Sequence, residues 1–311
     1  MEFDRKINIG LSRCGSLGPM TPCKSLNKMK KVIIIGAPRS GTNMLRDVLC
    51  SLPRVGTWPC DEINYIWRYG NAISFSDEFT PDMASDKIRN YIAKQFNRIA
   101  QKYNLDTVVE KTCANSLRIG FLKKLFPDAY FIFIYRNGVD ASVSAQKRWQ
   151  APLDIPYLIK KARYVPPLDL PMYAVKYLRS RLHFVFSGDK KLSTWGPKIK
   201  NLDRLVRKLE LIEVCGKQWN TCVLKSIQGL AHVPEQQVCR ISYEEFVTEP
   251  EKNLKIVCEF LKIEASYKQI CSAVSTVSAA SIGKGKSELS SKEAARLLPQ
   301  INCGLKALGY F

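Results

Sequence analysis

A glycine-rich stretch, Gly36-Ala-Pro-Arg-Ser-Gly-Thr42, has residue types that can bind an anion through the backbone. Its two glycines let the chain turn sharply and approach a ligand closely. The run Val32–Ile35 before it is continuously apolar and β-branched, which predicts a strand buried on both faces of a parallel sheet. The apolar positions after it are spaced as on one helix face: Leu45, Val48, Leu49 and Leu52. Free amides at the start of this helix, near Thr42, would suit phosphate or sulfate.

This loop lacks the residues by which a P-loop binds a nucleoside triphosphate. In G-x-x-x-x-G-K-[ST] the lysine would stand where this chain has Thr42, and the magnesium-binding hydroxyl where it has Asn43. A P-loop-like kinase is therefore disfavoured, although it stays open as an alternative. Arg39 supplies a guanidinium within the loop instead. A tight turn with one exposed arginine is the simpler interpretation of the loop taken alone.

A second apolar strand runs directly into a helix further along the chain. The apolar run Tyr130–Tyr135 predicts the strand, and Asn137 marks the start of the helix. Arg136 stands at the strand end and Ser144 lies eight positions later (144 − 136), about two helical turns on. Arginine presents a planar fork that matches phosphate oxygens, and a serine hydroxyl can add one donor. The spacing thus predicts a second anion-binding corner.

Acidic and basic side chains occur at two further loop positions. Asp61 and Glu62 follow a loop, where paired acids are typical of a helix N-terminus but could also supply a general base. Lys111 follows the short strand Thr107–Val109. In open parallel sheets ligands lie beyond the carboxyl ends of strands, so Lys111 can face the same crevice as the glycine-rich loop. A solvated lysine in a connecting loop is its simpler interpretation.

The two corners together resemble a known enzyme family. Pro-Arg-Ser-Gly-Thr, residues 38–42, resembles the phosphosulfate-binding loop of sulfotransferases that use 3'-phosphoadenosine 5'-phosphosulfate (PAPS). IYRNGVDASVS, residues 134–144, resembles their 3'-phosphate motif. The order of loop, Glu110-Lys-Thr, Leu-Phe-Pro-Asp and arginine-serine motif is similar to the carbohydrate and tyrosylprotein branch. The resemblance covers roughly residues 31 to 149 and identifies the family by two separated motifs in the right order.

The resemblance implies roles for individual residues. Glu62 would be the general base, with Asp61 or Glu110 as alternatives, and Arg39 and Lys111 would stabilise charge on the leaving oxygen. The amides of Ser40, Gly41 and Thr42 would hold the 5'-phosphate, and Arg136 and Ser144 the 3'-phosphate. The full set of predicted cofactor-binding residues is Arg39, Ser40, Gly41, Thr42, Asn43, Arg136, Ser144, Ser281 and Lys284.

The glycine-lysine segment from Ser281 to Lys286 resembles a cofactor-covering segment, in which Lys284 would meet the phosphates. Gly285 replaces the tryptophan often found after this basic residue, so the group that covers the adenine is not identified. A flexible basic turn is the alternative for this stretch.

These strand and helix patterns predict an α/β protein with a P-loop-like three-layer fold, a central parallel sheet flanked by helices. We expect residues 1–29 to form a flexible N-terminal tail. Residues 30–311 would form a single sulfotransferase-like domain with an irregular, proline-rich insertion at about 150–198. Aromatic and basic residues in this insertion would suit a sugar or an acidic acceptor, or would pack as a lid.

Composition limits the classes of function. Lys and Arg number 48 against 28 Asp and Glu, a formal charge of +20, which favours polyanions such as nucleic acid, acidic membrane surfaces, acidic polymers or a polyphosphorylated cofactor. We expect no specific nucleic-acid binding. The 11 cysteines include no Cys-x-x-Cys pair and the chain has only two histidines, so we expect no metal. Cysteines inside apolar runs (Cys50, Cys239, Cys258) indicate reduced thiols, hence a cytoplasmic location, and no apolar stretch has the length of a membrane span.

The sequence as a whole predicts a sulfotransferase that moves the sulfuryl group of PAPS to a hydroxyl acceptor by in-line transfer, with a carboxylate base and no metal. A carbohydrate or glycoconjugate, acidic glycans among them, is the preferred acceptor. Three alternatives stay open: a tyrosylprotein-type sulfotransferase, a P-loop-like kinase and a non-catalytic polyanion-binding protein. The sequence does not indicate an oligomeric state.

Overall fold

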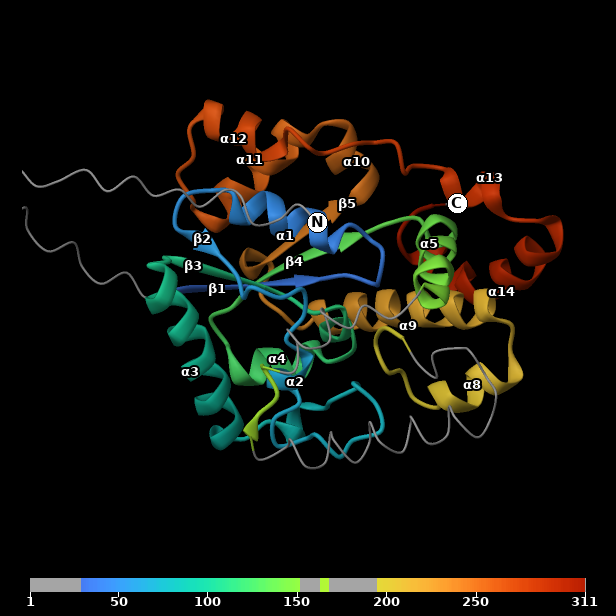
Figure 1. Ribbon diagram of the computed structural model, residues 1–311, viewed down its shortest axis with the longest axis horizontal. Helices are drawn as coiled ribbons and strands as arrows, with labels where there is room; N and C mark the ends of the chain where they lie inside the picture. Colours follow the sequence, from blue (N-terminus) through green and yellow to red (C-terminus); the bar gives the residue numbers. More distant parts are fainter. Residues whose placement is uncertain (1–28, 152–162, 168–194, 311) are drawn as a thin grey trace, which may run out of the picture.

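The computed structural model describes residues 29–151, 163–167 and 195–310 (Figure 1). Five parallel strands form one sheet in the order β2-β3-β1-β4-β5. The strands are β1 (Lys30–Ile35), β2 (Val55–Gly56), β3 (Thr107–Lys111), β4 (Tyr130–Tyr135) and β5 (Val238–Ser242). Helices cover both faces of the sheet, so the predicted three-layer α/β fold is confirmed. The expected tail, apart from Met29, and most of the expected insertion at 150–198 lie outside the described residues.

Alternate residues of the central strands enter two different cores, as the pleat of a strand requires. Val32 and Ile34 face one helical layer, whereas Ile33 and Ile35 face the other, and all four are fully buried. The first layer contains α1 (Thr42–Cys50), α10 (Tyr243–Thr248), α11 (Pro250–Leu261) and α12 (Tyr267–Val274). The second contains α2 (Asn64–Trp67), α3 (Asp86–Tyr103) and α4 (Ile119–Leu125). Burial on both faces explains the continuous apolar runs in the sequence.

A third core lies beyond the carboxyl ends of the strands, where α5, α9 and α14 pack together (Figure 1). Its helices are α5 (Gly138–Gln150), α8 (Leu202–Lys208), α9 (Leu211–Leu230), α13 (Lys284–Glu288) and α14 (Ser291–Ala307). Short 3₁₀ helices are η1 (Pro81–Met83), η2 (Cys113–Leu117) and η4 (Glu235–Gln237). The helices α8 and α9 are separate, because Glu210 and Glu213 form a capping box that starts α9.

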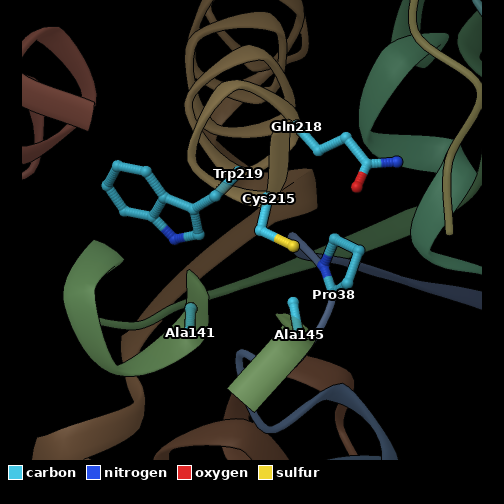
Figure 2. A pocket seen from close by; sticks show the side chains of 6 residues that line it. All are labelled: Pro38, Ala141, Ala145, Cys215, Gln218 and Trp219. Carbon is cyan, nitrogen blue, oxygen red and sulfur yellow. The ribbon is translucent and has the colours of Figure 1, made fainter. Parts of the chain in front are cut away.

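The glycine-rich loop is supported from beneath by this third core. Pro38 lines a small pocket with Ala141 and Ala145 of α5 and with side chains of α9 (Figure 2). Gln218 Nε2 donates to the carbonyls of Trp195 and Pro197, both at 2.9 Å, which holds that segment near Pro38. The loop therefore rests on two packed helices and is not an isolated turn.

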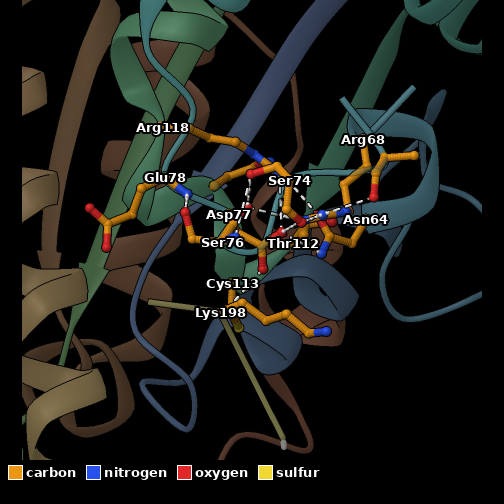
Figure 3. Close-up of polar contacts among 12 residues, drawn as sticks. Asn64, Arg68, Ser74, Ser76, Asp77, Glu78, Thr112, Cys113, Arg118 and Lys198 are labelled. Carbon is orange, nitrogen blue, oxygen red and sulfur yellow. Dashed lines mark hydrogen bonds and ion pairs between the residues drawn. The ribbon is translucent and has the colours of Figure 1, made fainter. Parts of the chain in front are cut away.

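A buried polar network lies beneath the end of β3 (Figure 3). The carboxylate of Asp77 is 1% exposed and accepts hydrogen bonds from Arg68 Nη1 (2.5 Å), Asn64 Nδ2 (3.2 Å) and Lys198 N (2.9 Å). Arg118 lies 3.8 Å from the same carboxylate. Because buried charges are stable only when they are paired and hydrogen-bonded, these residues act as one unit.

Glu110 belongs to the same polar layer. It is 1% exposed, and its two oxygens accept from Thr112 Oγ1 (2.5 Å) and Asn115 Nδ2 (2.6 Å). Burial raises the pKa of Glu110 to about 7, although the hydrogen bond from Thr112 and the nearby Arg118 and Lys111 oppose the shift.

Two expectations from the sequence concern reduced cysteines and the absence of a membrane span. Every cysteine there is a free thiol, and Cys239 and Cys258 are buried as expected. Within these ranges, no helix combines the length and the apolar composition that crossing a bilayer would demand.

The backbone at Gly41 leads to a stability prediction. Its φ is +85°, and a Cβ there would lie 2.4 Å from Tyr243 Cδ2. We expect Gly41→Ala to lower the free energy of unfolding by about 2–4 kcal/mol, measured by urea denaturation, because strain and a steric clash combine. Gly283→Ala is the control, since φ is +75° there but no heavy atom lies within 4 Å. Equal losses in the two variants would contradict the clash.

Glu110 leads to a prediction about pH. Its folded pKa of about 7 exceeds the ordinary value of about 4.3, so its contribution to stability is complete below pH 4 and is lost as pH rises through 7. We expect the wild type to lose about 3 kcal/mol from this group between pH 4 and pH 8, and Glu110→Gln to lack that loss. Urea unfolding of both proteins across this range measures the difference. Parallel pH curves would show that Glu110 does not titrate abnormally.

Candidate active site

The register of the sheet brings three loops to one edge. β1 lies between β3 and β4, with Ile34 opposite Lys111 and Ile35 opposite Phe133. The glycine-rich loop after β1 therefore lies between the residues that follow β3 and those that follow β4. This is the edge at which ligands bind in parallel sheets.

The start of α1 offers free backbone donors. Among the described residues, no backbone carbonyl accepts a hydrogen bond from the amides of Gly41, Thr42 or Asn43, and no side chain caps the helix. Ser40 differs from expectation, because its amide already donates to the carbonyl of Ala37 at 3.2 Å. Its hydroxyl is fully buried and has no partner within the described part of the chain. The helix start can thus bind an anion through three amides.

Arg136 connects the second corner to the first. Its Nη1 donates to the carbonyl of Arg39 at 3.2 Å, and its Nη2 donates to the carbonyl of Ser281. The guanidinium carbon lies 4.5 Å from the centre of the Tyr243 ring, the same ring that packs against Gly41. Arg136 is 7% exposed, and its Nε is buried without a partner in the described ranges. The two corners predicted from the sequence therefore lie together.

Arg39 and Ser144 meet at this second corner. Arg39 Nε donates to Ser144 Oγ at 2.9 Å. We expected Arg39 to act beside Lys111, whereas the structure places its side chain on the β4 side of the loop. Loss of solvation and then the positive charge of Arg136 lower the pKa of Arg39. An anion bound between these two guanidinium groups would relieve their repulsion.

The segment that contains Ser281 and Lys284 borders this corner. Ser281 contributes its carbonyl to Arg136, and the Lys284 side chain is exposed. The amides of Gly283 and Gly285 donate to the carboxylate of Asp140, at 2.8 and 2.7 Å. Sequence reasoning missed Asp140. The available signal was its place in the first turn of the predicted helix, four residues after Arg136, where a carboxylate can reach back to the arginine before the helix start.

Glu62 and Lys111 form an ion pair on the β3 side. Lys111 Nζ and the amide of Cys113 both donate to Glu62 Oε1, each at 3.2 Å. Burial lowers the pKa of Lys111, but the Glu62 carboxylate and other nearby acidic groups outweigh burial, so the net shift is upward. Thr42 Oγ1 lies 3.7 Å from Cys113 Sγ, which links this pair to the start of α1. The carboxylate and the ammonium therefore flank the free amides.

The two alternative bases have other partners. Asp61 pairs with Nη1 of Arg46, a residue of α1, at 3.1 Å. Glu110 lies within the buried polar network, so it cannot reach a substrate, and its candidacy as a base is wrong. The side chain of Glu62, by contrast, is 25% exposed, and its carboxylate lies near the free amides at the start of α1.

Comparisons with known proteins bear on the family and on the fold. Residues 31–154 match the model of the sulfotransferase family. The fold is similar to the sulfotransferase domain of the Synechococcus PCC 7002 olefin synthase (13% identity, TM-score 0.54, 94% of this chain and 99% of that one). It is also similar to the sulfotransferase domain from the curacin biosynthetic pathway (13% identity, TM-score 0.51, 91% of this chain and 98% of that one). No curated protein matches the chain in sequence.

The structural likeness, at such low identity, establishes the fold. The segment that matches the family model, residues 31–154, contains the glycine-rich loop, the Glu62–Lys111 pair and the motif from Arg136 to Ser144. This match agrees with the family predicted from the two motifs: residues 31–154 are similar to the sulfotransferase family, and the chain shares its fold with the two sulfotransferase domains.

Proposed function

We propose that this sulfotransferase uses PAPS as sulfuryl donor and a hydroxyl group of a carbohydrate or glycoconjugate as acceptor. One observation carries the proposal. Three free amides at the start of α1 are flanked by the Arg39–Arg136–Ser144 corner on one side and by the Glu62–Lys111 pair on the other. Such a site has anion donors at two places and a carboxylate base beside them.

The residues present fit a nucleotide with two anionic groups, a 5'-phosphosulfate and a 3'-phosphate. Arg136 Nε and Ser40 Oγ are buried polar atoms without partners in the described ranges, and Arg39 and Arg136 lie close enough to repel one another. An anion would satisfy and neutralise these groups. We assign the amides of Gly41, Thr42 and Asn43 to the 5'-phosphate, and Arg136 with Ser144 and Arg39 to the 3'-phosphate. Ser281 and Lys284 would border the 3'-phosphate.

PAPS, when bound, supplies the activated sulfuryl group. Glu62 and Lys111 then have separate roles, one toward the acceptor and one toward the leaving oxygen. Glu62 accepts the proton of the acceptor hydroxyl, and its hydrogen bonds from Lys111 and Cys113 hold its carboxylate in place. The Lys111 ammonium stabilises negative charge on the leaving oxygen. Because the hydrogen bond places Arg39 beside Ser144, we assign it to binding, not to the leaving oxygen.

The proposal that the acceptor is a carbohydrate hydroxyl rests on the composition of the insertion at about 150–198. Most of the aromatic and basic insertion on which the carbohydrate preference rests lies outside the described residues. A tyrosylprotein acceptor is the alternative, and an acidic glycan would be attracted by the formal charge of +20. Free thiols throughout the described ranges favour a reducing compartment, so we propose a cytoplasmic location.

Two measurements test the function. Calorimetric titration should show binding of 3'-phosphoadenosine 5'-phosphate (PAP) in preference to ATP with magnesium. Transfer of radiolabelled sulfate from PAPS should then be measured on a panel of neutral sugars, acidic glycans and tyrosine peptides. Binding of ATP alone would favour the kinase alternative, and failure to bind PAP would refute the proposal.

Glu62→Gln tests the base. We expect turnover to fall about a hundredfold or more, with PAP affinity unchanged, because an amide cannot accept the proton. Asp61→Asn is the matched control, since this neighbouring carboxylate pairs with Arg46, and it should keep its turnover. A Glu62→Gln enzyme with normal turnover would move the base elsewhere.

Arg136→Lys tests the 3'-phosphate site. The variant keeps the positive charge but loses the planar fork, so we expect the Kd for PAP to rise about 10- to 100-fold, while kcat at saturating PAPS stays near normal. Arg240→Lys, an exposed arginine on the neighbouring β5, is the control. Lost turnover with unchanged affinity would contradict an anchoring role.

A further inference from the structure

Asp140 is an acidic residue in a corner otherwise rich in positive charge. It stands in the first turn of α5, is 5% exposed, and lies 3.5 Å from Arg136 Nη2. A carboxylate at this place would repel the 3'-phosphate that we assign to Arg136. Its presence therefore needs a compensating reason.

The two oxygens of Asp140 fix a distant part of the chain. Oδ2 accepts from the amide of Gly283 and Oδ1 from the amide of Gly285, residues 143 and 145 positions away. Both bonds are short, 2.8 and 2.7 Å, as expected when the acceptor is ionised. The carboxylate thus holds the segment from Ser281 to Gly285 against the start of α5.

The contact at Gly285 shows how closely the segment approaches. A Cβ at Gly285 would lie 2.6 Å from Asp140 Cα, so only glycine allows this distance. The same segment also supplies the Ser281 carbonyl to Arg136 Nη2. Asp140 and Ser281 together set the orientation of the guanidinium, because both engage the same nitrogen.

We propose that Asp140 is a positioning residue for the donor nucleotide. It joins Arg136 to the segment from Ser281 to Gly285, and so presents Arg136 and Lys284 to the 3'-phosphate as one preformed unit. This inference rests on the proposed function, since the phosphate is that of PAPS. Preformed donors lower the ordering cost of binding, which offsets the repulsion from the carboxylate.

Asp140→Asn tests the proposal with two independent measurements. Asparagine has one acceptor oxygen and no charge, so one of the two amides loses its partner. We expect hydrogen exchange in a peptide covering residues 281–286 to accelerate about tenfold or more. Calorimetry should show the Kd for PAP rising about tenfold or more, while kcat at saturating PAPS stays within about twofold of wild type.

Lys147→Gln is the matched control. Lys147 Nζ and Glu288 Oε1 form an ion pair at 2.7 Å between the same helices, α5 and α13, but their side chains are 62% and 38% exposed. Its loss should leave exchange and PAP affinity within about twofold of wild type. Equal behaviour of the two variants, or tighter PAP binding by Asp140→Asn, would overturn the proposal. A wild type that fails to bind PAP would refute the proposed function alone, because exchange still decides whether Asp140 holds the segment.

Discussion

The parallel pairing of β1 with β3 on one side and β4 on the other is the constraint on which the site depends. Each strand ends at the same edge of the sheet, so the loop after β1 meets Lys111 from β3 and Arg136 from β4. Neither neighbour is local in sequence. The hydrogen bonding of the sheet therefore places a helix start with free amides between two cationic side chains.

The two buried cations described at this edge, Lys111 and Arg136, are each paired with a carboxylate. Lys111 pairs with Glu62 and Arg136 with Asp140, although the chain as a whole is strongly basic. The pairing offsets the cost of removing charge from water and fixes each side chain before a ligand arrives. Arg39 is exposed instead, and its Nε donates to the hydroxyl of Ser144.

The end of β3 separates charged groups of two kinds onto opposite faces of the sheet. Lys111 faces the candidate site, while Glu110 enters the polar network around Arg118 and Asp77. Alternation along the strand makes this separation unavoidable, because neighbouring residues point to opposite sides. Asp77 in the same network also accepts a hydrogen bond from the amide of Lys198, which fixes the chain at that residue.

The sequence by itself determined the local elements and the position of both predicted anion corners along the chain. Continuous apolar runs marked β1 and β4, and the residues between strand and helix predicted the loop and the motif from Arg136 to Ser144. These features follow from short-range periodicity and from glycine conformation, which depend on neighbouring residues alone. The family and the layered fold followed from their order along the chain.

The tertiary structure alone decided which groups are partners. Arg39 donates to Ser144, and Asp140 accepts from two amides more than 140 residues away. The side chain of Glu110 points into a buried polar network. The helix break at Glu210 likewise escaped the apolar pattern, since a capping box depends on side-chain geometry. Hydrogen-bond partners between distant segments depend on how the layers pack, and no spacing within one segment contains that information.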